Sequence, residues 1–175
     1  MFDRTDMKPK MVSAILYATT AFTLWSFWDA LFGAADEPFM HYRYWGLLSL
    51  SIAGTVLFVA ACILTLFSTR IGTICALVGA TLSWPYFALQ MPKIPWSRVI
   101  SVLPNANWQE LLTAIFALII ASVYSMSELR RGNDEASRRN IGLKLTATFL
   151  YAAASFLLAY WRGIWEWLFR LRYGN

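Results

Sequence analysis

The chain has 175 residues, of which 58% are hydrophobic, 17% are aromatic and only 14% are charged. An average soluble domain carries about 25% charged residues, so this composition excludes an ordinary soluble protein. The net charge of +5 comes from basic residues grouped beside apolar stretches. That grouping argues against nucleic-acid binding and favours contact with anionic lipid headgroups.

Five apolar stretches follow one another along the chain, and each is long enough to cross a bilayer. A helix needs about 20 apolar residues to cross the ~30 Å hydrocarbon layer. The stretches leave no room for a soluble domain, so we predict a single all-α transmembrane domain over residues 1–175, a polytopic bundle of about five helices. The predicted spans are residues 11–32, 44–68, 71–90, 108–126 and 141–161.

The first stretch resembles a secretory signal in position, because basic residues precede it. Its length and its two tryptophans, Trp25 and Trp28, argue against cleavage, since a secretory core has about 7 to 15 apolar residues. We therefore predict a retained first helix.

The distribution of Lys and Arg predicts a cytoplasmic N-terminus, with a cytoplasmic loop at residues 127–140. The basic residues of the predicted inner side are Arg4, Lys8, Lys10, Arg70, Arg130, Arg131, Arg138, Arg139 and Lys144. Those of the outer side are Arg43, Lys93, Arg98, Arg162, Arg170 and Arg172. The last three weaken the bias, so four spans with a re-entrant last segment stay as an alternative. The expected location is a plasma membrane or an inner membrane of bacterial type.

Small residues at helical spacing predict the faces through which the helices pack. Gly72, Ala76 and Ala80 recur every four residues in the third span. Lipid tails solvate large apolar side chains well, so helices in a bilayer associate where small residues let their backbones approach. This face is expected to pack within the bundle or against a partner subunit.

Pro85 lies late in the third span and predicts a kink, because proline removes a backbone donor and clashes with the preceding turn. The proline-containing segment 91–107 that follows is predicted to be an interfacial helix or loop. The nearby aromatic residues suit a belt at the headgroup level. They are Trp84, Tyr86, Trp96 and Trp108.

The C-terminal residues 162–173 are predicted to extend the last helix as an amphipathic segment. Arg162 and Arg170 lie on one helical face, while Trp161 and Trp165 lie on another. Such a segment serves as an interfacial anchor or as a docking face for a partner, because Trp and Arg are enriched at interface hot spots.

Residue types that carry catalysis or bind cofactors are scarce. His41 is the single histidine, so it could offer at most one axial ligand to a haem or a pigment. Cys62 and Cys75 fall inside spans and are expected to be small apolar residues. We predict no catalytic residue, metal site or cofactor, while a pigment, haem or quinone shared with partner chains stays open.

Two acidic residues near the span ends leave a second functional hypothesis. Asp29 and Glu110 are predicted on one side of the membrane, where they could handle a cation or a proton together with the Pro85 kink. The favoured hypothesis is a non-catalytic accessory or structural subunit of a larger membrane protein complex, packing against other membrane subunits. The alternative is a small homo-oligomeric carrier or channel for a small or lipophilic solute.

Overall fold

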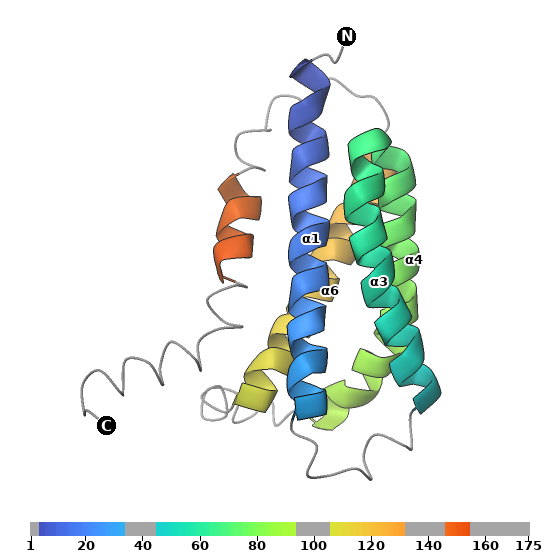
Figure 1. Cartoon of the computed structure of the whole chain (residues 1–175), viewed down its shortest axis with the longest axis vertical. Helices are drawn as coiled ribbons and strands as arrows, with labels where there is room; N and C mark the ends of the chain where they lie inside the picture. Colours follow the sequence, from blue (N-terminus) through green and yellow to red (C-terminus); the bar gives the residue numbers. More distant parts are fainter. Residues whose placement is uncertain (1–3, 34–44, 94–105, 132–145, 155–175) are drawn as a thin grey trace, which may run out of the picture.

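The computed structural model describes residues 4–33, 45–93, 106–131 and 146–154, which are helical at every position except Ser68. Residues 146–154 form a helix beside α1, drawn in orange in Figure 1. The other elements are α1 (Arg4–Gly33), α3 (Trp45–Phe67), α4 (Thr69–Gln90), the 3-10 turn η1 (Met91–Lys93) and α6 (Ala106–Arg131).

The four long helices form an antiparallel bundle in which each helix packs against its neighbours in the chain. α1 packs against α3, α3 against α4, and α4 against α6, while α6 returns to α1 and closes the ring. Figure 1 shows α6 running behind α1 and crossing it at an angle. The starts of α1 and α4 therefore lie at the same end of the bundle as the end of α6.

The pair α3 and α4 makes the closest helix contact in the ring. Ser68 reverses the chain in an extended conformation and caps α4, its hydroxyl accepting the Ile71 amide at 3.5 Å. A Cβ atom at Gly72 would meet Thr65, whose backbone nitrogen is 2.7 Å from the Cβ position. One Cβ at Gly54 would lie 2.5 Å from the Gly79 carbonyl oxygen. Glycine at these positions lets the two backbones touch.

Burial in this bundle runs opposite to hydropathy. The span of α3 has a mean hydropathy of 2.5, yet only 33% of it is buried, whereas that of α1 has a mean hydropathy of 1.2 and is 67% buried. In water the most apolar helix would be the most buried one. Exposed apolar side chains are expected where lipid is the solvent.

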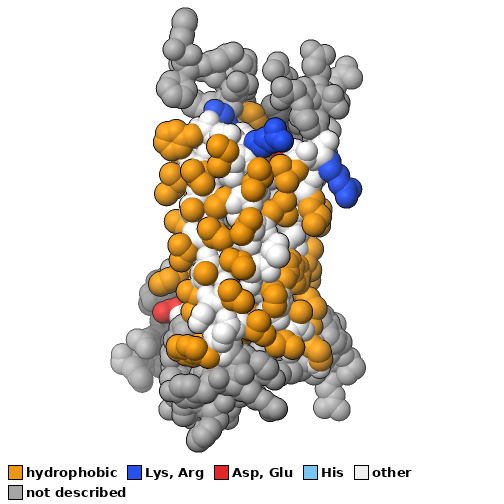
Figure 2. Space-filling view, turned by 90° about the vertical axis from the view of Figure 1, so that its right-hand side faces the viewer, with side chains coloured by type: hydrophobic (Ala, Val, Ile, Leu, Met, Phe, Trp, Pro, Cys, Tyr) orange, Lys and Arg blue, Asp and Glu red, His pale blue; other side chains and the backbone are white. Residues whose placement is uncertain are grey.

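The exposed surface supports this interpretation. Figure 2 shows hydrophobic side chains covering the face that it presents, with Lys and Arg side chains at one end. All four long helices are long and apolar enough to cross a membrane: Pro9–Asp29, Trp45–Phe67, Thr69–Gln90 and Glu110–Arg130. The described part of the chain is therefore all-helical and has four helices with the length and composition of membrane spans.

Four of the five predicted spans coincide with α1, α3, α4 and α6. The fifth stretch, residues 141–161, is described only at residues 146–154, which pack on α1 through Tyr151. Of the predicted interfacial segment 91–107, the structure describes η1 and the first residues of α6. The rest of both segments, most of the loop 127–140 and the extension 162–173 lie outside the described residues.

Candidate functional site

Tyr17 is the polar centre of the bundle interior. It lies in α1, it is fully buried, and its hydroxyl donates to Thr73 Oγ1 of α4 at 3.3 Å. The same hydroxyl shares a hydrogen bond of 3.0 Å with Ser125 Oγ of α6. One turn closer to the N-terminus, Ser13 Oγ lies 2.7 Å from the Tyr124 hydroxyl. One face of α1 is thus bonded to two other helices.

Further hydrogen bonds connect the remaining helix pairs. Trp84 Nε1 of α4 donates to Ser122 Oγ of α6 at 3.1 Å. Cys75 Sγ of α4 contacts the Leu57 carbonyl oxygen of α3 at 3.4 Å as a weak donor. Thr20 Oγ1 of α1 lies 3.4 Å from the Tyr151 hydroxyl. In a bilayer such bonds are worth about 0.6 kcal/mol each on average.

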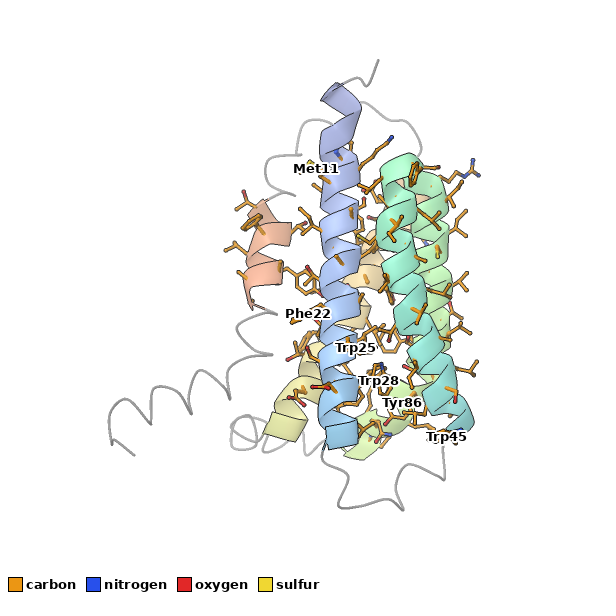
Figure 3. The ribbon with its side chains drawn as sticks, in the orientation of Figure 1. Met11, Phe22, Trp25, Trp28, Trp45 and Tyr86 are labelled. Atoms are coloured by element: carbon orange, nitrogen blue, oxygen red, sulfur yellow. The ribbon has the colours of Figure 1, made fainter. Side chains whose placement is uncertain are left out.

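An aromatic cluster fills the bundle at the end away from the N-terminus. It consists of Phe27 and Trp28 of α1 with Tyr86 and Phe87 of α4, and all four side chains are buried. The rings of Trp28 and Tyr86 have centroids 5.1 Å apart, and Figure 3 shows both side chains between α1 and α3. Trp28 Nε1 donates to Thr55 Oγ1 of α3 at 3.0 Å. The cluster therefore joins three helices.

Two residues assigned to the aromatic belt face the interior instead. Tyr86 is buried in the cluster, and Trp84 is half-buried with its indole bonded to α6. Their level in the membrane stays a prediction, because depth along the helix does not determine which side of the helix a ring takes. The side chains of Trp96 and Trp108 are outside the described part.

Ser51 carries a fully buried hydroxyl in the described part of the chain that is left unpaired. It is fully buried in α3, and its Oγ has no hydrogen-bond partner. Its carbonyl oxygen accepts from Thr55 Oγ1 at 3.0 Å and from Ser83 Oγ at 3.5 Å. Ser83 also donates to the Gly79 carbonyl oxygen at 2.9 Å. The unpaired hydroxyl therefore lies at the α3–α4 contact, beside Gly54 and Gly79.

The charged side chains that the structure describes lie at or next to the ends of the candidate spans. Lys10, Arg70 and Arg130 lie at the end where α1 begins, and Figure 2 shows cations at that end. Glu128 is at the same end, whereas Asp29 and Glu110 are at the other. The predicted inner segments thus share one end of the bundle.

The residues of the carrier hypothesis lie near one end but not on one inner surface. Asp29 is exposed in the last turns of α1, and Glu110 is half-buried at the start of α6. Pro85 is exposed on α4, where it leaves the Thr81 carbonyl without a backbone donor. Figure 1 shows the last turns of α4 swinging toward α1. This bend brings the residues after Pro85 into the aromatic cluster.

The predicted packing residues Gly72, Ala76 and Ala80 are buried within the chain. Gly72 lies against Thr65 of α3, and Ala76 and Ala80 have exposures of 0% and 2%. Packing within the bundle accounts for this face, so it offers no surface to a partner subunit.

The remaining predicted residues lie outside the described part of the chain. They are His41, Trp161, Arg162, Trp165 and Arg170. Within the described part, no group of three His, Cys, Asp or Glu side chains is arranged to hold a metal ion. Cys62 and Cys75 are free thiols and half-buried.

Sequence reasoning did not identify Tyr17 or Tyr124, which bond α1 to α4 and α6. A usable signal was present, because both tyrosines are followed or preceded by Ser or Thr within one helical turn, inside the apolar stretches. Hydroxyls and indole N–H groups supply donors and acceptors but no acid or base at neutral pH. The interior is therefore suited to holding helices together.

The bundle defines a class, that of all-helical proteins with four helices able to cross a membrane. Comparisons with protein families, with curated proteins and with solved structures found no match.

Proposed function

We propose that the chain is a non-catalytic accessory or structural subunit of a larger membrane protein complex. The proposal rests on one observation: interior hydroxyl groups are engaged in hydrogen bonds between helices of the chain. Tyr17 and Ser13 bond to other helices, so these polar groups are engaged within the chain. A carrier needs interior polar groups that are free to exchange bonds with a solute.

The outside of the bundle supports the same proposal. Three of its helices expose large apolar side chains over much of their length, and α3 is only 33% buried. In a bilayer these faces meet either lipid or the helices of another subunit. The carrier alternative draws less support, because Pro85 and Asp29 are exposed on the outside of their helices.

Extraction of the native membrane in a mild detergent, followed by size separation, tests the proposal. We expect the chain to migrate in a stoichiometric assembly with other membrane proteins, identified by mass spectrometry. Migration alone, near its own mass of 19.9 kDa, would contradict the proposal.

A matched set of surface variants locates the contact. Val56 on α3, Val78 on α4 and Val123 on α6 are exposed valines. Each is changed to Trp, which adds bulk on one face and leaves the interior intact. We expect one variant to leave the assembly while the other two stay in it, because a subunit contact occupies one face. Equal retention of all three would argue against a contact through α3, α4 or α6.

Asp29→Asn separates the two hypotheses in reconstituted vesicles. The subunit hypothesis expects unchanged assembly, whereas the carrier hypothesis expects loss of solute uptake. Leu89→Ala, which changes another exposed residue, serves as the control.

A further inference from the structure

An open groove lies along the last turns of α6. Among the described residues its lining is Val123, Met126, Ser127 and Arg130 of α6, and its volume is about 370 Å³. These positions are spaced i, i+3, i+4 and i+7, so they form a continuous stripe. With a rise of 1.5 Å per residue, the groove runs about 10 Å along the helix.

The groove changes from apolar to cationic along its length. Val123 and Met126 are exposed apolar side chains that line the groove farther from the end of α6. Arg130 is exposed at the end of the bundle that also carries Lys10 and Arg70. Ser127 donates its hydroxyl to the Tyr124 carbonyl oxygen at 2.8 Å, so the cationic donor among the described lining residues is the Arg130 guanidinium. One leaflet of a bilayer has the same order, with charged headgroups at the surface and apolar chains beneath them.

The charge of the groove identifies its occupant. A guanidinium matches a phosphate in charge and in hydrogen-bond geometry. An acyl chain matches the apolar side chains of Met126 and Val123.

We propose that this groove binds an anionic glycerophospholipid, with its phosphate at Arg130 and the first part of an acyl chain along Met126 and Val123. The site is separate from the proposed subunit function, because it lies on the isolated chain and needs no partner.

Native mass spectrometry of the full chain in detergent tests the site. The chain is titrated with phosphatidylglycerol and with phosphatidylcholine of identical acyl composition. One cation near a membrane surface is worth about 1 kcal/mol, so we expect about fivefold tighter binding of phosphatidylglycerol. Arg130→Gln is expected to remove this preference. Arg70→Gln, a matched change at the same end but outside the groove, is expected to keep it.

Two further arms separate the lipid from other occupants. Val123→Trp fills the apolar part and is expected to weaken both lipids, while soluble glycerol phosphate is expected not to displace phosphatidylglycerol. Equal losses in Arg70→Gln and Arg130→Gln would overturn the proposal in favour of diffuse attraction. Displacement by glycerol phosphate would overturn it in favour of a free-phosphate site. Unchanged lipid binding in Val123→Trp would overturn the placement of the acyl chain in the groove. If this variant also leaves the assembly, the groove is a protein contact instead. Helical circular dichroism confirms that each variant folds.

Discussion

The contact between α3 and α4 allows a sharp test of the fold, because the chain contains a matched control. A Cβ atom at Gly54 would lie 2.5 Å from the Gly79 carbonyl oxygen. At Gly46, on the same helix, a Cβ atom would meet nothing within 4 Å. We therefore expect Gly54→Ala to destabilise the bundle and Gly46→Ala to leave it unchanged or slightly more stable.

The magnitude follows from the geometry. The new methyl group would be about 1 Å closer than the 3.5–4.0 Å optimum for nonbonded atoms, and its neighbour is backbone that cannot rotate away. Overpacking of this kind costs about 1–3 kcal/mol. Gly54→Ala also gains helix propensity of up to about 1 kcal/mol, which offsets part of this cost, whereas Gly46 is the second residue of α3 and gains less there. The two variants should therefore differ by about 1–2 kcal/mol in free energy of unfolding.

The assay is reversible unfolding in mixed micelles, by titration with sodium dodecyl sulfate and circular dichroism detection. A cycle with Gly79→Ala adds a second check, because a Cβ atom at Gly79 would lie 2.8 Å from the Gly54 carbonyl oxygen. Once one substitution has moved the helices apart, the second should cost less than it does alone. Equal stability of Gly54→Ala and Gly46→Ala would refute the close contact.

Three other predictions follow, of which the first two use the same preparation and the third uses intact membranes. Tyr17→Phe removes hydrogen bonds to two helices and should lower the free energy of unfolding by about 1 kcal/mol; no change would mean that these bonds do not hold the bundle. Ser51→Ala should be neutral or stabilising in the same titration because its buried hydroxyl is unpaired, whereas Ser83→Ala should destabilise; the reverse order would contradict the arrangement. In a variant whose native cysteines are replaced, Arg70→Cys and Trp45→Cys should react with an impermeant maleimide from opposite sides of the membrane, Arg70→Cys from the cytoplasm; labelling from one side would contradict a crossing by α3.

The number and the place of the long helices could be predicted from the sequence, because the bilayer sets the length of an apolar stretch. The second span, predicted at residues 44–68, is α3 at Trp45–Phe67. The ends were less predictable where polar residues continue the helix. The fourth span was predicted to end at Met126, yet α6 continues to Arg131, since helical hydrogen bonds extend past the hydrocarbon layer.

The inward faces could not be predicted in the same way. Each span has apolar residues on all sides of its helix, so the periodicity of the sequence does not distinguish a lipid-facing side from a packing side. The partners of Tyr17 lie 56 and 108 residues away, and no local pattern pairs them. The small residues of α4 indicated a packing face correctly, but whether that face met α3 or another chain depended on tertiary structure.

Polarity indicates the interior once lipid is taken as the solvent. The span of α1 has the lowest mean hydropathy of the four and is the most buried. Its exposed residues Met11, Ala18 and Trp25 recur every seven positions and Asp29 follows one turn after Trp25, so a narrow stripe of the described part of α1 faces outward. The α3 span, with a mean hydropathy of 2.5 and only 33% of it buried, therefore exposes more apolar surface than α1 does. The buried hydroxyls of Ser13 and Tyr17 on the opposite side bond α1 to α4 and α6, so the least apolar span lies inside the bundle because its polar groups find partners there.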